Sequence, residues 1–222
     1  MTAPKTTGKP TGRSAGKREP CRPRRSRRPA AETRQEILRA AEELFRQRGY
    51  QQVAMADIAA ELEMSPANVF KHFHSKTALV DAIATAHLEK LMAGLADLEL
   101  LPSPQMKLLQ MAEQLLTKLL QDVCDNPHLF KMIVLTTDLE LAAADLYREK
   151  ICAIFETIVL EGVATGDFFV TDPHHTASVI ATALEGVIHP LSITREKPEI
   201  LHIRCRDLIG LVTTALQNPL AK

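Results

Sequence analysis

Apolar side chains in the first folded part of the chain recur every three or four residues, the spacing of a helix buried on one side. Thr33 followed by Glu36 has the form of a capping box, and Gly49 is a usual helix terminator. These features predict a first helix that Thr33 caps and Gly49 ends. Its apolar stripe consists of Ile37, Ala41, Leu44, Phe45 and the stem of Arg48.

Three shorter helical patterns follow. Met55 to Leu62 predicts a second helix, and Ser65 with Pro66 opens a third at about 66–72, because proline is favoured in a first turn. Ser75 opens a fourth, whose apolar stripe continues to Ala86.

The rest of the chain also has only helical patterns. No alternation of period two indicates a strand, and no repeat of 20–50 residues is present. We therefore predict an all-α protein of about nine helices. The five helices after residue 100 are expected at about 105–124, 128–136, 138–164, 173–189 and 198–217.

Charge divides the chain into two parts. Residues 1–31 hold ten Lys and Arg against one Glu, while the remainder holds 17 bases and 26 acids, so a net +9 precedes a net −9. The first 31 residues are too polar to form a core, which predicts a disordered basic arm. A basic arm on an acidic body indicates nucleic acid or another anionic surface as partner.

Other compositional features point to the cytoplasm. The four cysteines show no paired framework and are expected to be reduced thiols. No apolar run is long enough to predict a transmembrane helix, and the N-terminal residues lack the apolar stretch of a secretory signal. We expect a cytoplasmic, bacterial-type protein without a membrane partner.

The stretch "SPANVFKHFHSK" (65–76) combines apolar and polar chemistry on one short helix. On a helical wheel Val69 and Phe73 point one way, whereas Asn68, Lys71 and His72 point the other. Asn reads adenine, and Lys reaches guanine or phosphate, so the polar face suits the edges of bases in a major groove. A small residue at Ala59 and a branched one ten positions later have the spacing of a helix-turn-helix.

The segment 33–83 resembles the DNA-binding domain of the TetR family of transcriptional repressors. The resemblance rests on Thr33, Ile37, Ala41, Phe45, Gly49, Ile58, Ala59, Ser65, Val69, Phe70, Phe73, Lys76 and Leu79. It implies a recognition helix at about 66–72 that binds double-stranded DNA. The DNA-binding residues implied are Ser65, Pro66, Ala67, Asn68, Phe70, Lys71, His72 and Lys76.

Three positions depart from the family pattern. Phe70 stands where a Tyr usually offers its hydroxyl to phosphate, and Glu63 occupies the turn position usually held by Gly. Ala54 replaces the Thr or Ser that usually caps the second helix. Each lost cap, and each non-Gly residue in a left-handed turn, costs on the order of 1 kcal/mol.

The resemblance also implies the division of the chain and its partners. We expect an arm at 1–31, a helix-turn-helix domain at 32–80, and a helical ligand-binding and dimerisation domain at 81–222. A homodimer would form through the helices at 173–189 and 198–217, and an unknown small-molecule effector would bind between the fifth and seventh helices. The expected pocket residues are Leu115, Leu119, Phe130, Met132, Val134, Tyr147, Ile151 and Phe155.

Several alternatives remain open. Each pocket residue taken singly is more typical of ordinary core. The chain could be an architectural DNA-binding protein that uses its basic arm without a ligand. No nucleophile–base pair, glycine-rich phosphate loop or carboxylate motif predicts an enzyme, and no cofactor is expected. His72 and His74 point about 200° apart on a helix, so no metal site is predicted there.

Overall fold

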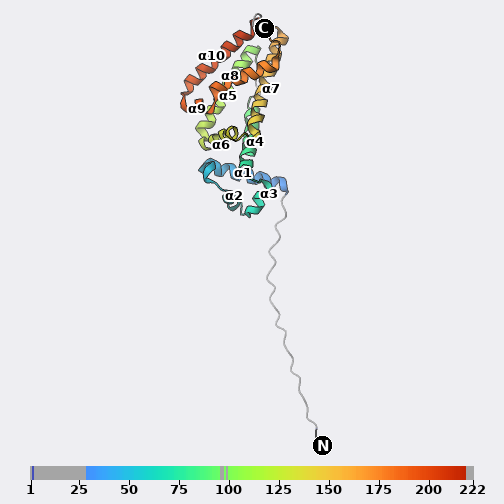
Figure 1. Cartoon of the computed structure of the whole chain (residues 1–222), viewed down its shortest axis with the longest axis vertical. Helices are drawn as coiled ribbons and strands as arrows, with labels where there is room; N and C mark the ends of the chain where they lie inside the picture. The colour runs from blue at the N-terminus through green and yellow to red at the C-terminus, as the bar shows by residue number, and fades with distance from the viewer. Residues whose placement is uncertain (1, 3–28, 96–97, 99, 219–222) are drawn as a thin grey trace.

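The computed structural model describes residues 2, 29–95, 98 and 100–218. Within these residues the chain is all helical, which confirms the predicted fold class. Figure 1 shows a small lower lobe that contains α1, α2 and α3, joined by α4 to a larger bundle. The elements are α1 (Ala30–Arg48), the 3-10 helix η1 (Tyr50–Gln52), α2 (Met55–Glu61), α3 (Pro66–His72), α4 (Lys76–Ala93), α5 (Pro104–Asp125), α6 (Pro127–Asp138), α7 (Ala142–Thr165), α8 (Pro173–Ile188), α9 (Pro190–Arg195) and α10 (Pro198–Leu216).

Local capping explains where most of these helices begin and end. The side chains of Ser65, Ser75 and Asp172 each accept a hydrogen bond from a backbone N–H of the first turn that follows, at 3.3, 3.0 and 2.9 Å. Proline occupies the start of α3, α5, α8 and α10, where its missing N–H costs nothing. Gly166 ends α7 in the left-handed conformation, with φ of +78°, as the sequence predicts.

The predicted start of the first helix was wrong. α1 begins at Ala30 after Pro29, so Thr33 lies inside the helix instead of capping it. The Thr33 hydroxyl donates to the Pro29 carbonyl oxygen at 3.4 Å, and its side chain is buried. Because no residue between Pro29 and Thr33 disfavours a helix, the turn before the cap-like Thr33 is helical too.

A short helix that the sequence did not predict follows α8. The backbone leaves the helical conformation at His189, with φ of −56° and ψ of 139°, and α9 then starts at Pro190. Proline therefore both ends one helix and opens the next, whereas the sequence pattern indicated only an end.

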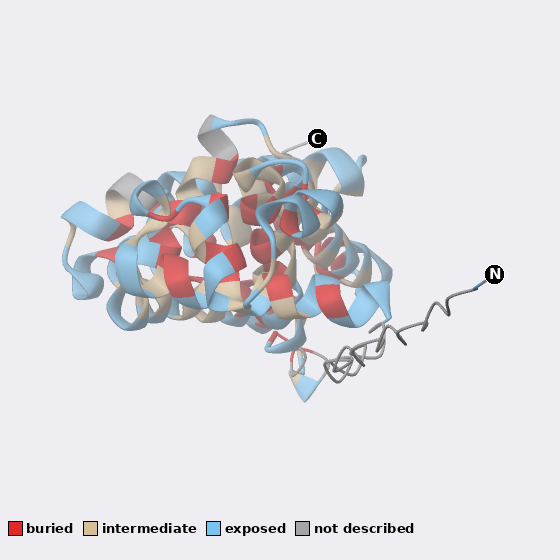
Figure 2. Ribbon diagram, turned by 90° about the horizontal axis from the view of Figure 1, so that it is seen from below, coloured by how far each residue is buried: buried red, intermediate tan, exposed pale blue. Residues whose placement is uncertain are grey.

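Buried side chains form two clusters, and Figure 2 shows the buried positions inside the ring of exposed helix faces. The head cluster is made by α1 to α3 with parts of α4 and α6, and it includes Ile37, Phe45, Ile58, Val69 and Phe73. The body cluster lies among α4 to α10 and includes Leu108, Leu115, Phe155, Leu184 and Leu201.

Two helices contribute to both clusters. α4 places Leu79 and Ile83 in the head cluster and Leu88 and Leu91 in the body cluster. α6 places Leu129 and Met132 in the head cluster, but Phe130 in the body cluster. The predicted boundary between residues 80 and 81 therefore falls within a continuous helix, and the head is completed by residues from beyond it.

The predicted arm lies almost entirely outside the described residues. Of residues 1–31, the structure describes only Thr2 and 29–31, and Ala30 and Ala31 are the first residues of α1. α1 thus begins two residues before the predicted domain boundary.

One stretch of the described chain, Pro173–Arg195, is long and apolar enough to cross a membrane by length and composition alone. It is not one uninterrupted helix, because α8 and α9 are separated at His189. Ala177, Ile180 and Leu184 of this stretch are buried in the body cluster. Its apolar composition is therefore explained in part by packing within the protein.

Candidate nucleic-acid interface

The lobe around the head cluster is here called the head. In it, one face of α3 is exposed and the other packs against α1 and α2. Val69 and Phe73 are buried, with 0% and 2% of their surface exposed, and they join Ile58 and Ala59 of α2 in the head cluster. Arg34 of α1 lies over the Phe73 ring, 4.5 Å from its centroid, a cation–π contact that fixes the back of α3 against α1. No local sequence pattern indicated Arg34, since this contact joins residues 39 positions apart.

The turn between α2 and α3 is left-handed at Glu63, the position where the family pattern usually has glycine. Glu63 has φ of +50°, in the left-handed region that favours glycine. The turn is closed by backbone hydrogen bonds from Glu63 N to Ala60 O at 3.1 Å and from Met64 N to Ala59 O at 2.8 Å. The chain therefore adopts the left-handed turn with a glutamate.

The start of α2 has a substitute for its missing cap. Ala54 has no side-chain acceptor, but its own backbone N–H donates to Asp57 Oδ2 at 2.7 Å. This is the reciprocal half of a capping box, in which an acidic third residue reaches back to the cap position. Asp57 thus satisfies one backbone donor, while the phosphate contact of a capping hydroxyl is absent at Ala54.

The polar face predicted for α3 is solvent-facing. Ser65, Pro66, Ala67, Asn68, Phe70 and Lys71 are exposed, whereas His72 is half-buried. The Asn68 side-chain amide has a weak contact with Met64 Sδ at 3.5 Å, and the Lys71 ammonium has no polar partner among the described residues. The face therefore presents an amide and an unpaired cation, as the wheel indicated.

Phe70 is a large exposed apolar residue at the edge of this face. Its side chain is 45% exposed and offers no hydroxyl to a phosphate. It can contribute apolar contact to sugars or bases, but it cannot replace the hydrogen bond that a tyrosine would make.

Lys76 has a more inward position than the sequence indicated. Its Nζ lies 4.1 Å from the centroid of the Tyr50 ring and 6.0 Å from that of Phe45. Burial lowers the pKa of Lys76, and the nearby Asp57 carboxylate partly opposes this by raising it. At the first residue of α4, Lys76 therefore supports the head from within as well as carrying charge near a helix N-terminus.

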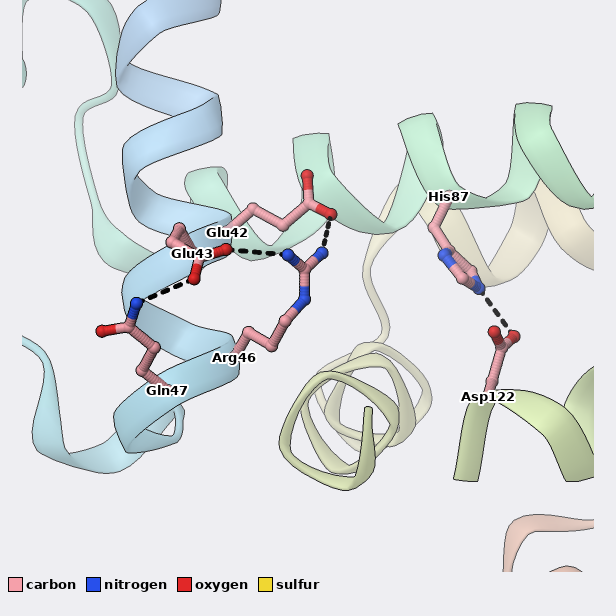
Figure 3. A network of polar contacts seen from close by, with 6 residues as sticks. All are labelled: Glu42, Glu43, Arg46, Gln47, His87 and Asp122. Atoms are coloured by element: carbon pink, nitrogen blue, oxygen red, sulfur yellow. Dashed lines mark hydrogen bonds and ion pairs between the residues drawn. The ribbon is translucent and has the colours of Figure 1, made fainter. Parts of the chain in front are cut away.

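Polar contacts join α4 to two helices of the body, α5 and α7. Asp81 Oδ1 accepts from the backbone N–H of Ala143 at 2.9 Å, and it caps α7, whose own cap position Leu141 offers no side-chain acceptor. His87 Nε2 lies 2.8 Å from Asp122 Oδ2 of α5 (Figure 3). The helix that carries the head is thus bonded to both α5 and α7.

Figure 3 also shows a polar cluster on α1. Arg46 binds Glu42 and Glu43 at 2.8 Å each, and Gln47 donates to Glu43 at 2.7 Å. These pairs are three or four residues apart on one helix, a spacing that stabilises the helix by a few tenths of a kcal/mol per pair. The Arg46 guanidinium is therefore paired with two carboxylates, and this group of side chains does not attract a DNA phosphate because its net charge is −1.

The eight expected pocket residues are divided between the two buried clusters. Leu115, Phe130, Ile151 and Phe155 are packed in the body cluster, with Leu119, Val134 and Tyr147 partly buried against it. Met132 lies instead in the head cluster, because α6 turns it towards α1. Of the eight, only Tyr147 and Ile151 line a hollow of about 240 Å³, which lies between α7 and α8.

Histidine and cysteine side chains are the remaining candidates for a metal site. The described residues contain no group of three His, Cys, Asp or Glu side chains suited to hold a metal ion. Cys205 is buried, and burial together with Glu113 raises the pKa of its thiol to about 11, so it is held as a neutral thiol. Cys205 is part of the body cluster.

Comparison with known proteins matches both halves of this architecture. The family described as "Bacterial regulatory proteins, tetR family" matches residues 37–83, and "Tetracyclin repressor-like, C-terminal domain" matches residues 104–209. The transcriptional regulator UidR of Escherichia coli K12 is 38% identical over 64 residues, which are 29% of this chain and 33% of UidR. The chain thus matches only about a third of that relative's length.

Solved structures share the fold across nearly the whole chain. A TetR-family transcriptional regulator from Pectobacterium atrosepticum aligns with a TM-score of 0.67 at 19% identity, over 86% of this chain and 98% of that one. RolR in complex with resorcinol aligns with a TM-score of 0.61 at 17% identity, over 83% of this chain and 92% of that one. At these identities the likeness concerns the fold alone.

A helix-turn-helix head on a helical body defines a class of DNA-binding transcriptional regulators, which are not enzymes. The chain belongs to the TetR family of these regulators.

Proposed function

We propose that the protein is a homodimeric repressor that binds a palindromic operator and is released by a small molecule. The observation that carries the proposal is the exposed Asn68 and Lys71 on α3, directly opposite the buried Val69 and Phe73. A short helix anchored on one side and polar on the other can enter a major groove with its side chains at the base edges.

Within this proposal the recognition residues have different roles. Asn68 reads a base, Lys71 contacts a base or a phosphate, and half-buried His72 contacts the edge of the groove. Ser65, Pro66 and Ala67 bring the start of α3 close to the DNA, and Phe70 packs against sugars. Lys76 contacts a phosphate at the start of α4, if its ammonium turns away from Tyr50 when DNA binds.

Dimerisation through α8 and α10 is supported by apolar side chains left on their outer faces. Val179 is 53% exposed on α8, and Ile203 and Leu211 are 47% and 71% exposed on α10. Gly186 and Gly210 on the same helices have nothing within 4 Å of where a Cβ would stand, so another helix could approach closely there. Two-fold symmetry then places two copies of α3 one DNA turn apart, about 34–36 Å.

Two further parts of the proposal concern the arm and the site of action. The basic arm adds contacts to DNA phosphates, since its Lys and Arg residues directly precede the head. Binding to the chromosome would associate the protein with the nucleoid.

The alternative is an architectural protein without an effector. The tight packing between α5 and α7 favours this alternative, while the hollow between α7 and α8 favours a sensor.

Selection of genomic DNA fragments by the purified dimer tests the function. We expect recovery of a palindromic sequence, and Asn68→Ala should weaken binding to it by about 1–3 kcal/mol while changing binding to random DNA little. Gln47→Ala, an exposed change on α1 outside the proposed interface, is the control. Equal losses on operator and random DNA would show that Asn68 does not read bases, and a dimer that ignores duplex DNA would refute the proposal.

A further inference from the structure

The hollow between α7 and α8 is the feature of the body that the proposed function leaves unexplained. Its volume of about 240 Å³ is below the roughly 300–1,000 Å³ of sites for drug-sized ligands, so only a small molecule fits. Ile151 and Ile188 provide apolar wall, and both belong to the body cluster. A ligand held there would touch the core directly.

The polar wall of the hollow is acidic. Glu149 and Glu185 line it, and neither carboxylate forms a hydrogen bond or ion pair with a described residue. Among the described residues of the wall, Arg148 is the one basic side chain, and its guanidinium is already paired with Asp145. The lining of the hollow therefore carries a net negative charge, because Glu149 and Glu185 outnumber Arg148.

The neighbouring titratable groups are consistent with this potential. Burial, together with the charge of Glu185, raises the pKa of Tyr147 well above its ordinary value. Burial and the nearby Glu156 likewise raise the pKa of the Cys152 thiol. Both groups are thus neutral at physiological pH, and the Tyr147 hydroxyl, which has no polar partner among the described residues, remains available as a hydrogen-bond donor or acceptor.

We infer that this hollow binds a small amphipathic cation, with its apolar part against Tyr147 and Ile151 and its ammonium group beside Glu185. An aromatic ring next to an unpaired carboxylate attracts an ammonium group by cation–π and charge contacts together. An anionic ligand of the same size would meet two carboxylates and a single basic side chain that is already paired with Asp145, so it is rejected.

The position of the hollow links it to the head, and this step rests on the proposed function. Tyr147 lies one turn after Ala143, whose backbone N–H is bonded to Asp81 of α4. A ligand that displaces the first turns of α7 therefore pulls on the helix that carries α3. The bound cation is thus the effector of the regulator.

Intrinsic fluorescence gives a direct binding test without DNA. The chain has two tyrosines and no tryptophan, so in a Tyr50→Phe background Tyr147 is the only tyrosine. The probes are 2-phenylethylamine, a cation at pH 7, the neutral 2-phenylethanol and the anion phenylacetate. We expect the amine alone to change the Tyr147 emission in a saturable way and to raise the melting temperature.

Matched variants locate the charge contact. Glu185→Gln should weaken binding of the amine about tenfold or more, as expected for loss of a charged partner. Glu89→Gln, an exposed change on α4 that does not line the hollow, should leave binding unchanged. Glu185 is itself exposed, so its substitution should preserve the fold, which circular dichroism checks.

The outcomes separate this inference from the proposed function. Absence of amine binding, equal binding of the three probes, or no effect of Glu185→Gln would overturn the inference, while operator binding measured without amine still tests the function. Binding of the amine that leaves operator affinity unchanged would refute its role as effector. An operator complex released by the amine, but not after Glu185→Gln, would support both.

Discussion

Replacing Gly162 by alanine tests how tightly the end of α7 is packed. A Cβ built at Gly162 would lie only 2.0 Å from Cδ2 of Phe168 and 2.5 Å from its Cε2. The ring is 2% exposed, and the Phe168 N–H donates to the Gly162 carbonyl at 2.9 Å. The next residue, Phe169, is tied to the end of α10 by a hydrogen bond to Leu216 O at 2.7 Å, so the ring cannot move away freely.

Two opposing contributions set the size of the effect. Alanine in place of glycine within a helix gains about 1 kcal/mol through backbone propensity. Overpacking a buried site costs about 1–3 kcal/mol, and this site falls in the upper part of that range because the clash involves an anchored ring. We therefore expect a net loss of about 1–2 kcal/mol in the free energy of unfolding.

Urea unfolding followed by circular dichroism measures this change at a fixed protein concentration. The matched comparison adds Gly162→Ala to a Phe168→Leu background, where the smaller side chain leaves room for the new methyl group. There the alanine should cost less than in the natural chain. If Gly162→Ala alone is neutral or stabilising, the packing argument is wrong.

Three further changes test the head and the arm. Glu63→Gly should stabilise the protein by about 0.5–1 kcal/mol in thermal or urea unfolding, because glycine relieves the left-handed strain, whereas Glu63→Ala keeps the strain and should change little. Lys76→Ala should weaken DNA binding on all sequences and reduce the salt slope by about 1; an unchanged slope would show that its role is confined to packing over Tyr50. Deletion of residues 1–31 should lower DNA affinity mainly at low salt, and identical salt titrations with and without the arm would show that it does not bind DNA.

Many features of the head follow from local sequence signals. The cap and proline of α3 and the opposite placement of Val69 and Asn68 depend on residues within two helical turns of one another. For the same reason the left-handed φ of Glu63 could be anticipated from its place in the turn. Short-range geometry fixes which side of a helix a residue occupies, so it can be deduced without knowing the partner helix.

Other parts of the site depend on contacts between distant residues. The periodicity of α6 shows that Met132 is buried, but not that it faces α1 in the head cluster. Lys76 was expected at the surface, and its placement over Tyr50 follows from how η1 packs beside α4. The hollow likewise depends on how α7 and α8 pack beside Tyr147, which no pattern along either helix encodes.

The sequence by itself determined most of the helices, the helix-turn-helix and the polar face of α3, because propensity, capping and periodicity act over a few residues. Only the tertiary structure decided which apolar stripes meet, how Asp81 joins α4 to α7, and where open space remains. An apolar stripe specifies that a face must be buried, whereas the partner that buries it is selected by the shape and packing of the whole chain.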